Sequence, residues 1–142
     1  MTSPHPYLML PGTAREALEF YHRVFGGNLV LNTFADFQRS DGPGEAIAHG
    51  MLQGDVELYA SDVAGDEPPL STQGLMFTLL GAADPATLRS WFVALAEGGE
   101  VVDELQRRPW NASDGQVRDR FGVLWLVGYE HGESPDAAAR AE

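Results

Sequence analysis

Apolar side chains recur at helical spacing between residues 14 and 25, where they take one face while charged side chains take the other. Thr13 precedes this stretch, and Glu16 follows three residues later, which is the pattern of a capping box at a helix start. Gly26-Gly27 ends the stretch, because glycine accepts the left-handed conformation that closes a helix. The sequence therefore predicts a helix over 14–25.

A second helix is predicted to begin at Asp84-Pro85, with aspartate as the N-cap and proline at the first helical position. Gly98-Gly99 is expected to end it. Its apolar face consists of Leu88, Trp91, Phe92 and Leu95.

Short apolar or β-branched runs flank both helices and predict strands. In the first half of the chain the predicted strands cover 7–10, 29–34, 46–52 and 56–60. In the second half they cover 75–80, a strand that opens at 101–102, then 116–119 and 123–129.

The order strand, helix, double glycine, strand, hairpin occurs twice. The Gly-Gly pairs lie 72 residues apart and the hairpin glycines Gly54 and Gly122 lie 68 apart, so that GDVELYA aligns with GVLWLVG. Such repetition indicates two copies of one structural unit. We therefore predict an α+β protein of two βαβββ modules, about 6–62 and 74–130, joined by a polar linker over 63–73.

Residues 1–131 are predicted to form a single domain. The remaining stretch, 132–142, has no apolar face to bury and is predicted to be a flexible tail.

Composition narrows the classes of function. The 142-residue chain has 21 acidic and 9 basic residues, which argues against nucleic acid or an anionic membrane surface as a partner. It has no cysteine, which excludes disulfides, thiolate zinc sites and a cysteine nucleophile. No apolar run approaches the roughly 20 residues that span a bilayer, and the N-terminus lacks the pattern of a signal peptide. We expect a cytoplasmic protein.

Four stretches resemble a known family: PYLMLPGTAREALEFYHRVFGG at 6–27, AIAHGMLQGDVELYASD at 46–62, LAEGGEV at 95–101 and DRFGVLWLV at 119–127. The most specific are AREALEFY followed by FGG, and D-x-F-G-x-x-W. They resemble the PhnB-like proteins of the vicinal-oxygen-chelate superfamily, which includes glyoxalases, bleomycin-resistance proteins and dioxygenases. The resemblance implies that the strands form a curved, mixed sheet, or cup, with the helices outside, and that the protein is a homodimer.

The resemblance also implies where a metal would bind. Metal-using members hold a divalent cation in the cup, at equivalent strand positions of the two modules. Glu57 adjoins one of these positions, and a step of one residue turns a strand side chain to the opposite face, so we expect Glu57 outside the cup. We predict no cofactor and disfavour a divalent metal, with His49 and Glu57 as weak candidate ligands. The positions themselves hold no side chain suited to a cation: Pro6, Leu58, Leu75 or Met76, and Leu126.

His49 is the leading candidate for ligand contact or catalysis. It lies within AIAHGML, and the resembling proteins also carry a histidine in that strand. An imidazole on a pocket wall can donate a hydrogen bond, accept a proton near neutral pH or bind a metal. The alternative is a half-buried histidine bonded to a carbonyl or a tyrosine. The other histidines, His5, His22 and His131, are expected to be exposed and inert.

Aromatic and cationic residues complete the candidate ligand contacts. Trp110, beside Pro109 in a loop, either covers a pocket mouth or anchors the loop. Arg118 either contacts an anionic ligand or pairs with Asp119 to fix a hairpin. Trp125 either packs in the core or faces the cup. The same alternatives hold for Phe34, Tyr59 and Phe77.

We therefore expect a PhnB-like protein that binds a small molecule and lacks the usual metal site. The alternative is an enzyme of the same superfamily, a glyoxalase-like lyase or isomerase, with a non-standard site that uses His49 as base or ligand. A third class is a protein whose dimer surface is itself the function. No Walker, Rossmann or G-x-S-x-G motif is present.

Overall fold

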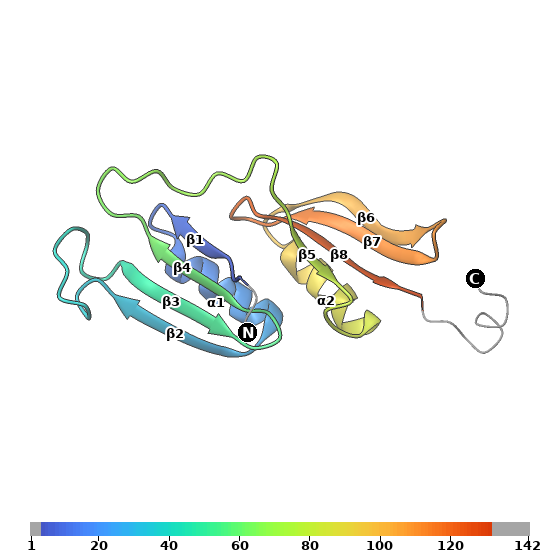
Figure 1. Ribbon diagram of the computed structural model, residues 1–142, viewed down its shortest axis with the longest axis horizontal. Coiled ribbons are helices and arrows are strands. Elements are labelled where there is room, and N and C mark those ends of the chain that lie inside the picture. The colour runs from blue at the N-terminus through green and yellow to red at the C-terminus, as the bar shows by residue number, and fades with distance from the viewer. Residues whose placement is uncertain (1–3, 132–142) are drawn as a thin grey trace. The chain divides into compact units, whose positions relative to one another are not determined.

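A computed structural model of the chain describes residues 4–131. The chain divides into two compact units between Ser71 and Thr72, inside the predicted linker. Each unit contains one helix and one four-stranded sheet (Figure 1). The predicted α+β class and the two βαβββ modules are confirmed. The tail predicted over 132–142 lies outside the described residues.

The first module consists of β1 (Tyr7–Leu10), α1 (Ala14–Phe25), β2 (Asn28–Thr33), β3 (Ile47–Gln53) and β4 (Leu58–Asp62). The strand order is β1-β4-β3-β2, with β1 parallel to β4 and the other pairs antiparallel. α1 packs so closely on one face that a Cβ on Gly50 would lie 2.3 Å from Cδ1 of Leu18. The opposite face carries no helix of this module, and we call it the helix-free face of the first sheet. Its side chains are the alternate strand residues Tyr7, Met9, His49, Met51, Tyr59 and Ser61.

The second module repeats this topology with β5 (Phe77–Leu80), α2 (Pro85–Leu95), β6 (Glu100–Arg108), β7 (Ala112–Arg118) and β8 (Leu124–Glu130). The strand order is β5-β8-β7-β6, and β5 runs parallel to β8. The face covered by α2 holds the buried residues Leu79, Val117, Trp125 and Val127. The helix-free face of the second sheet holds the alternate residues Thr78, Asp114, Gln116, Arg118, Leu124 and Leu126.

The start of α1 differs from the predicted capping box. Thr13 is the N-cap residue, but its side chain makes no capping hydrogen bond. The carboxylate of Asp62, at the end of β4, accepts instead from the backbone N–H of Ala14 at 2.9 Å and from that of Ile47 at 2.8 Å. Because Asp62 is only 8% exposed, a buried carboxylate joins the starts of α1 and β3 to the end of β4.

The double glycines have different roles in the two modules. Gly26-Gly27 ends α1 as predicted, with φ values of 73° and 97°. Gly27 also permits a close backbone approach, since a Cβ there would lie 2.5 Å from the carbonyl oxygen of Gln53. In the second module α2 already ends at Leu95, so Gly98-Gly99 lies in the turn before β6.

Candidate functional site

Five polar and aromatic side chains gather on the helix-free face of the first sheet. They come together because β4 lies between β1 and β3, which brings residues that are distant in sequence side by side. The parallel register of β1 and β4 places Tyr7 directly beside Tyr59. We call this group the Tyr–His cluster, and its members are His5, Tyr7, His49, Glu57 and Tyr59.

Two hydrogen-bonded groups make up the Tyr–His cluster. The hydroxyl of Tyr7 lies 2.9 Å from Nδ1 of His49. Tyr59 donates its hydroxyl to Oε2 of Glu57 at 3.0 Å, and Nε2 of His5 lies 3.2 Å from the same oxygen.

Ring contacts connect the two groups. Tyr7 and His49 are stacked, with ring centroids 5.6 Å apart, and Tyr7 meets Tyr59 edge-on at 6.2 Å. Tyr7 is exposed and the other four side chains are half-buried. The cluster therefore presents aromatic rings and polar atoms at a surface rather than in the core.

The hydrogen bond to Glu57 raises the pKa of Tyr59 above its ordinary value, and partial burial acts in the same direction. The neutral phenol is the form that can donate to the carboxylate, so the bond favours the protonated state. Tyr59 thus remains a neutral phenol at neutral pH, and its hydroxyl donates a hydrogen bond to Glu57.

Two predictions for this face are wrong. Glu57, expected outside the cup, lies on the helix-free face, where it bonds Tyr59. Leu58, which is 1% exposed, faces the helix. His5, expected to be exposed, is half-buried and contacts Glu57. The error over Glu57 lies in the 68-residue offset that aligned Leu58 with Leu126. Leu126 lies on a helix-free face and Leu58 does not, so the two residues are not equivalent and the 68-residue offset does not hold along this strand.

The residues at the usual metal positions do not fit a divalent cation. Leu58 is buried on the helix-covered face, and Leu126 has no donor atom. The hydroxyl of Tyr59, next to Leu58 in the chain, donates to Glu57. Within residues 4–131, no three His, Asp or Glu side chains lie close enough together to hold a metal ion. Metal independence stays a prediction, which a titration can test.

Arg118 lies on the helix-free face of the second sheet and lines an open hollow of about 570 Å³ together with Met76 and Leu124. Its Nη1 donates to the carbonyl oxygen of Gly122 at 3.0 Å. Asp119, the other residue of the alternative pairing, is buried and accepts from the indole N–H of Trp125.

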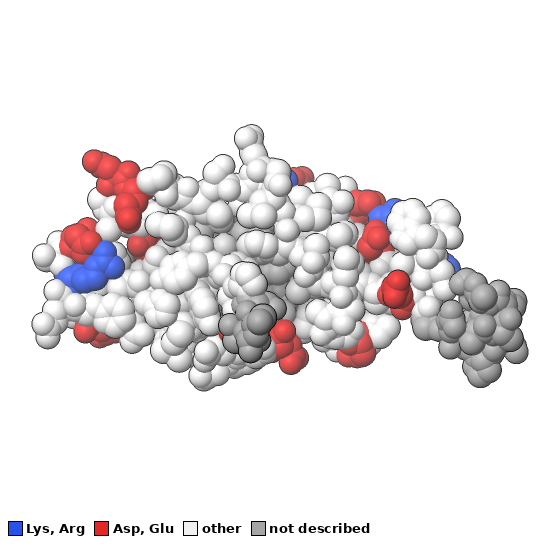
Figure 2. Space-filling model, in the orientation of Figure 1, with Lys and Arg blue, Asp and Glu red and all other residues white. Residues whose placement is uncertain are grey.

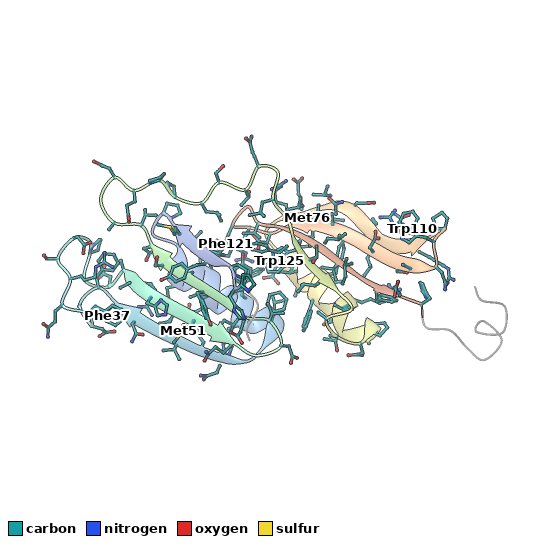
Figure 3. The ribbon with its side chains drawn as sticks, in the orientation of Figure 1. Phe37, Met51, Met76, Trp110, Phe121 and Trp125 are labelled. Carbon is teal, nitrogen blue, oxygen red and sulfur yellow. The ribbon has the colours of Figure 1, made fainter. Side chains whose placement is uncertain are left out.

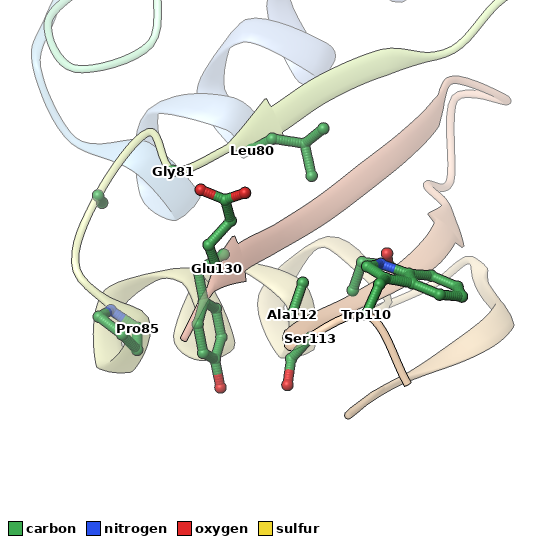
Figure 4. A pocket seen from close by; sticks show the side chains of 10 residues that line it. Leu80, Gly81, Pro85, Trp110, Ala112, Ser113 and Glu130 are labelled. Carbon is green, nitrogen blue, oxygen red and sulfur yellow. The ribbon is translucent and has the colours of Figure 1, made fainter. Parts of the chain in front are cut away.

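Trp110 lies at the β6–β7 turn and is 66% exposed (Figure 3). It lines a second hollow of about 600 Å³, with Leu80 and Glu130 between it and Pro85 (Figure 4). Trp110 and Arg118 stand at opposite ends of β7. At about 3.3 Å per strand residue they are roughly 20 Å apart, so one small ligand does not contact both.

Three aromatic candidates belong to the core instead of a ligand face. Trp125 is 1% exposed and Phe34 is fully buried, so the alternative in which they face the cup is wrong. Phe77 packs edge-on against Trp125, with ring centroids 5.4 Å apart, on the helix-covered side. Of the aromatic strand candidates, only Tyr59 reaches a helix-free face.

The remaining histidines make local contacts. Nε2 of His22 lies 3.0 Å from the carbonyl oxygen of Gly27, at the end of α1. Nε2 of His131, predicted to be exposed and inert, lies 2.8 Å from the hydroxyl of Ser113. Neither residue belongs to the Tyr–His cluster.

Tyr7, a central member of the cluster, was missed by the sequence reasoning. The signal that could have found it is the parallel pairing of the first and last strands that a βαβββ unit contains. This pairing sets Tyr7 and Tyr59 beside each other on one face.

On the face shown in Figure 2, acidic residues are spread out and do not form a single patch, and few basic side chains appear. The net charge of −12 means that the chain as a whole repels a polyanion at long range. Among the described residues, no helix combines the length and the apolar character that crossing a membrane requires.

The chain belongs to the Glyoxalase/Bleomycin resistance protein/Dioxygenase superfamily, whose family model matches residues 4–127. Protein YjdN of Escherichia coli (strain K12) is 28% identical, over 86% of this chain and 91% of that protein. Protein PA1353 from Pseudomonas aeruginosa is 36% identical, and its crystal structure superposes with a TM-score of 0.78 over 93% of this chain and 100% of that one. The PhnB protein from Bacillus cereus, 19% identical, shares the fold with a TM-score of 0.73 over 92% and 100% of the two chains.

Proposed function

We propose that this protein binds a small organic molecule on the helix-free face of the first sheet, and that binding needs no divalent metal. The observation that carries the proposal is the Tyr–His cluster, in which Tyr7 bonds His49 at a partly exposed surface. Small-molecule sites combine aromatic and apolar walls with a few oriented polar groups. The cluster supplies the polar groups, and Met9 and Met51 on the same face supply apolar surface.

The exposure of the cluster favours recognition over a purely structural role. Hydrogen bonds between partly exposed side chains add little to stability, because water competes for both partners. Members of this superfamily bind small molecules, and the cluster brings polar side chains onto the helix-free face of the first sheet. Arg118 is a further candidate contact, suited to an anionic group because its guanidinium can bind a carboxylate bidentately.

The second candidate function is an enzyme of the same superfamily with a non-standard site. The half-buried position of His49 on the helix-free face supports it, since an imidazole at a surface can transfer a proton near neutral pH. Turnover that is lost on changing His49, in protein free of metal, would distinguish this enzyme from a binding protein.

We also propose that the protein is a homodimer. In the second sheet β6 is an edge strand that pairs with β7 alone, and Val101 and Val102 on it are exposed. Sheet edges with apolar side chains are surfaces that pairing with a second copy protects.

Native mass spectrometry of freshly purified protein would detect a retained small molecule and give its mass. Ligand-induced NMR shifts would then locate its site, and we expect them at Tyr7, His49 and Tyr59. His49→Ala should weaken binding by about 2- to 12-fold, the loss of one hydrogen bond. His22→Ala, which removes a histidine outside the cluster, is the matched control and should bind as the wild type does. Equal affinity of both variants would contradict the proposed site.

A further inference from the structure

We propose that Tyr7 is a positioning residue whose hydroxyl donates to Nδ1 of His49 and so keeps the proton of the neutral imidazole on Nε2. His49 then offers an N–H donor to the ligand. This inference rests on the proposed function and deepens it, because it names the chemistry that the site recognises. The ligand should present an oxygen acceptor, in the form of a carbonyl, carboxylate or phenolate group.

The direction of the bond follows from the acid–base properties of the two groups. A neutral imidazole has one donor nitrogen and one acceptor nitrogen. A phenol, with an ordinary pKa near 10, is a good donor, and an imidazole nitrogen is a stronger base than a phenol oxygen. At the observed 2.9 Å the Tyr7 hydroxyl is therefore the donor and Nδ1 of His49 the acceptor.

The neighbouring groups leave this arrangement undisturbed. The other hydroxyl of the cluster, on Tyr59, donates to Glu57 and does not compete for His49. Across the described range, 4–131, the Tyr7 hydroxyl has His49 as its protein partner and Nε2 of His49 has none. The N–H of Nε2 is thus available to a ligand on the helix-free face.

This tautomer also separates the two candidate functions. A general base must present a bare nitrogen to the proton that it removes. With Tyr7 on Nδ1 and the proton on Nε2, the neutral His49 presents a donor instead. The Tyr7–His49 contact therefore supports binding of an oxygen acceptor over proton abstraction by His49.

The tautomer can be read directly by long-range ¹H–¹⁵N NMR of protein labelled at histidine, at about pH 8. We expect His49 as the Nε2–H tautomer in the wild type and a mixture of both tautomers in Tyr7→Phe. Tyr7 is 43% exposed, so loss of its hydroxyl leaves the core unchanged. Tyr59→Phe is the matched control, because it removes a hydroxyl from the same face without touching Nδ1, and it should keep the wild-type tautomer. A wild-type Nδ1–H tautomer, or a Tyr7→Phe spectrum like that of the wild type, would overturn the role of Tyr7.

Two planar probes of similar shape test the ligand chemistry. Benzoate offers only acceptors and benzamidine only donors, so benzoate should shift the His49 ring signals and benzamidine should not. Tyr7→Phe should weaken benzoate binding by about 2- to 10-fold. If the protein prefers benzamidine, or if benzoate leaves the His49 signals unchanged, the proposed ligand chemistry is wrong. The role of Tyr7 is still decided separately, by the tautomer measurement. Failure of the proposed function itself would show differently, as a retained molecule bound away from the first sheet.

Discussion

The indole N–H of Trp125 donates to Oδ2 of Asp119 at 2.8 Å, inside the second module. The other carboxylate oxygen accepts from the backbone N–H groups of Phe121 at 2.8 Å and Val123 at 3.1 Å. Asp119 is 3% exposed and Trp125 is 1% exposed. The D-x-F-G-x-x-W motif is therefore a structural unit, in which one buried carboxylate ties the β7–β8 turn to the core.

Asp119→Ala should lower the free energy of unfolding by about 3 kcal/mol, because it leaves buried N–H donors without an acceptor. Urea denaturation followed by tryptophan fluorescence measures the change. Asp66→Ala, at an exposed position, is the control and should change stability by less than about 0.5 kcal/mol. Equal effects of the two substitutions would show that the Asp119 network contributes nothing.

Asp62→Ala should destabilise the first module much more than Thr13→Ala. Asp62 accepts two backbone hydrogen bonds while buried, and its loss should cost about 2–3 kcal/mol. The Thr13 side chain makes no capping bond, so its removal should cost only a few tenths of a kcal/mol. Urea denaturation compares the two variants. A larger loss of stability in Thr13→Ala would show that the Thr13 side chain caps the helix after all.

Tyr59 should ionise at a higher pH than an unperturbed tyrosine, since its hydrogen bond to Glu57 favours the neutral phenol. The raised pKa means that this bond stabilises the folded state at neutral pH, and that the contribution is lost as the pH rises through the raised value. Tyrosine-ring NMR signals followed against pH report each residue separately. Glu57→Gln should move the pKa of Tyr59 back toward its ordinary value of 10.0, and an unchanged titration would exclude Glu57 as the cause.

Tag-free protein should bind Ni²⁺, Zn²⁺ or Mn²⁺ only weakly by calorimetry, because within residues 4–131 no three His, Asp or Glu side chains lie close enough together to hold a metal ion. We also expect no methylglyoxal–glutathione isomerase activity with any of these ions. His49→Ala should bind the ions as weakly as the wild type. A one-to-one complex with submicromolar affinity, abolished by changing His49 or Glu57, would identify a metalloenzyme.

Sedimentation equilibrium at about 100 μM protein should return the mass of a dimer, twice the chain mass of 15.4 kDa. Val102→Lys, which places a charge on the exposed β6 edge, should shift the equilibrium toward monomer. Val93→Lys, on the exposed side of α2, is the matched control and should remain dimeric. A wild-type mass of one chain would refute the dimer.

Much of the fold follows from the sequence alone. The helix over 14–25 has the predicted bounds because its signals are local: an apolar stripe at helical spacing and a glycine pair that ends it. β1 also has the predicted bounds, 7–10. Some later strands differ from their predicted bounds: β7 begins at Ala112 and not at Gln116. Pairing with neighbouring strands extends a strand beyond its apolar residues.

The candidate site could be predicted only in part. His49 and Tyr59 were identified from their strands, and both reach the helix-free face. Phe34 and Trp125 had the same kind of strand pattern, yet both are buried. Alternation shows that two residues point to opposite sides, but it does not say which side a helix covers.

The sequence by itself determined two βαβββ units and their elements, because helix and strand periodicities and glycine turns depend on residues that are close together in the chain. The tertiary structure alone decided which side chains meet. Tyr7 reaches His49 across 42 positions and Asp62 reaches Ala14 across 48, and both contacts depend on β4 lying beside β1 and β3. Hydrogen bonds act over about 3 Å in space whatever the separation along the chain, so only the folded sheet brings the Tyr–His cluster together.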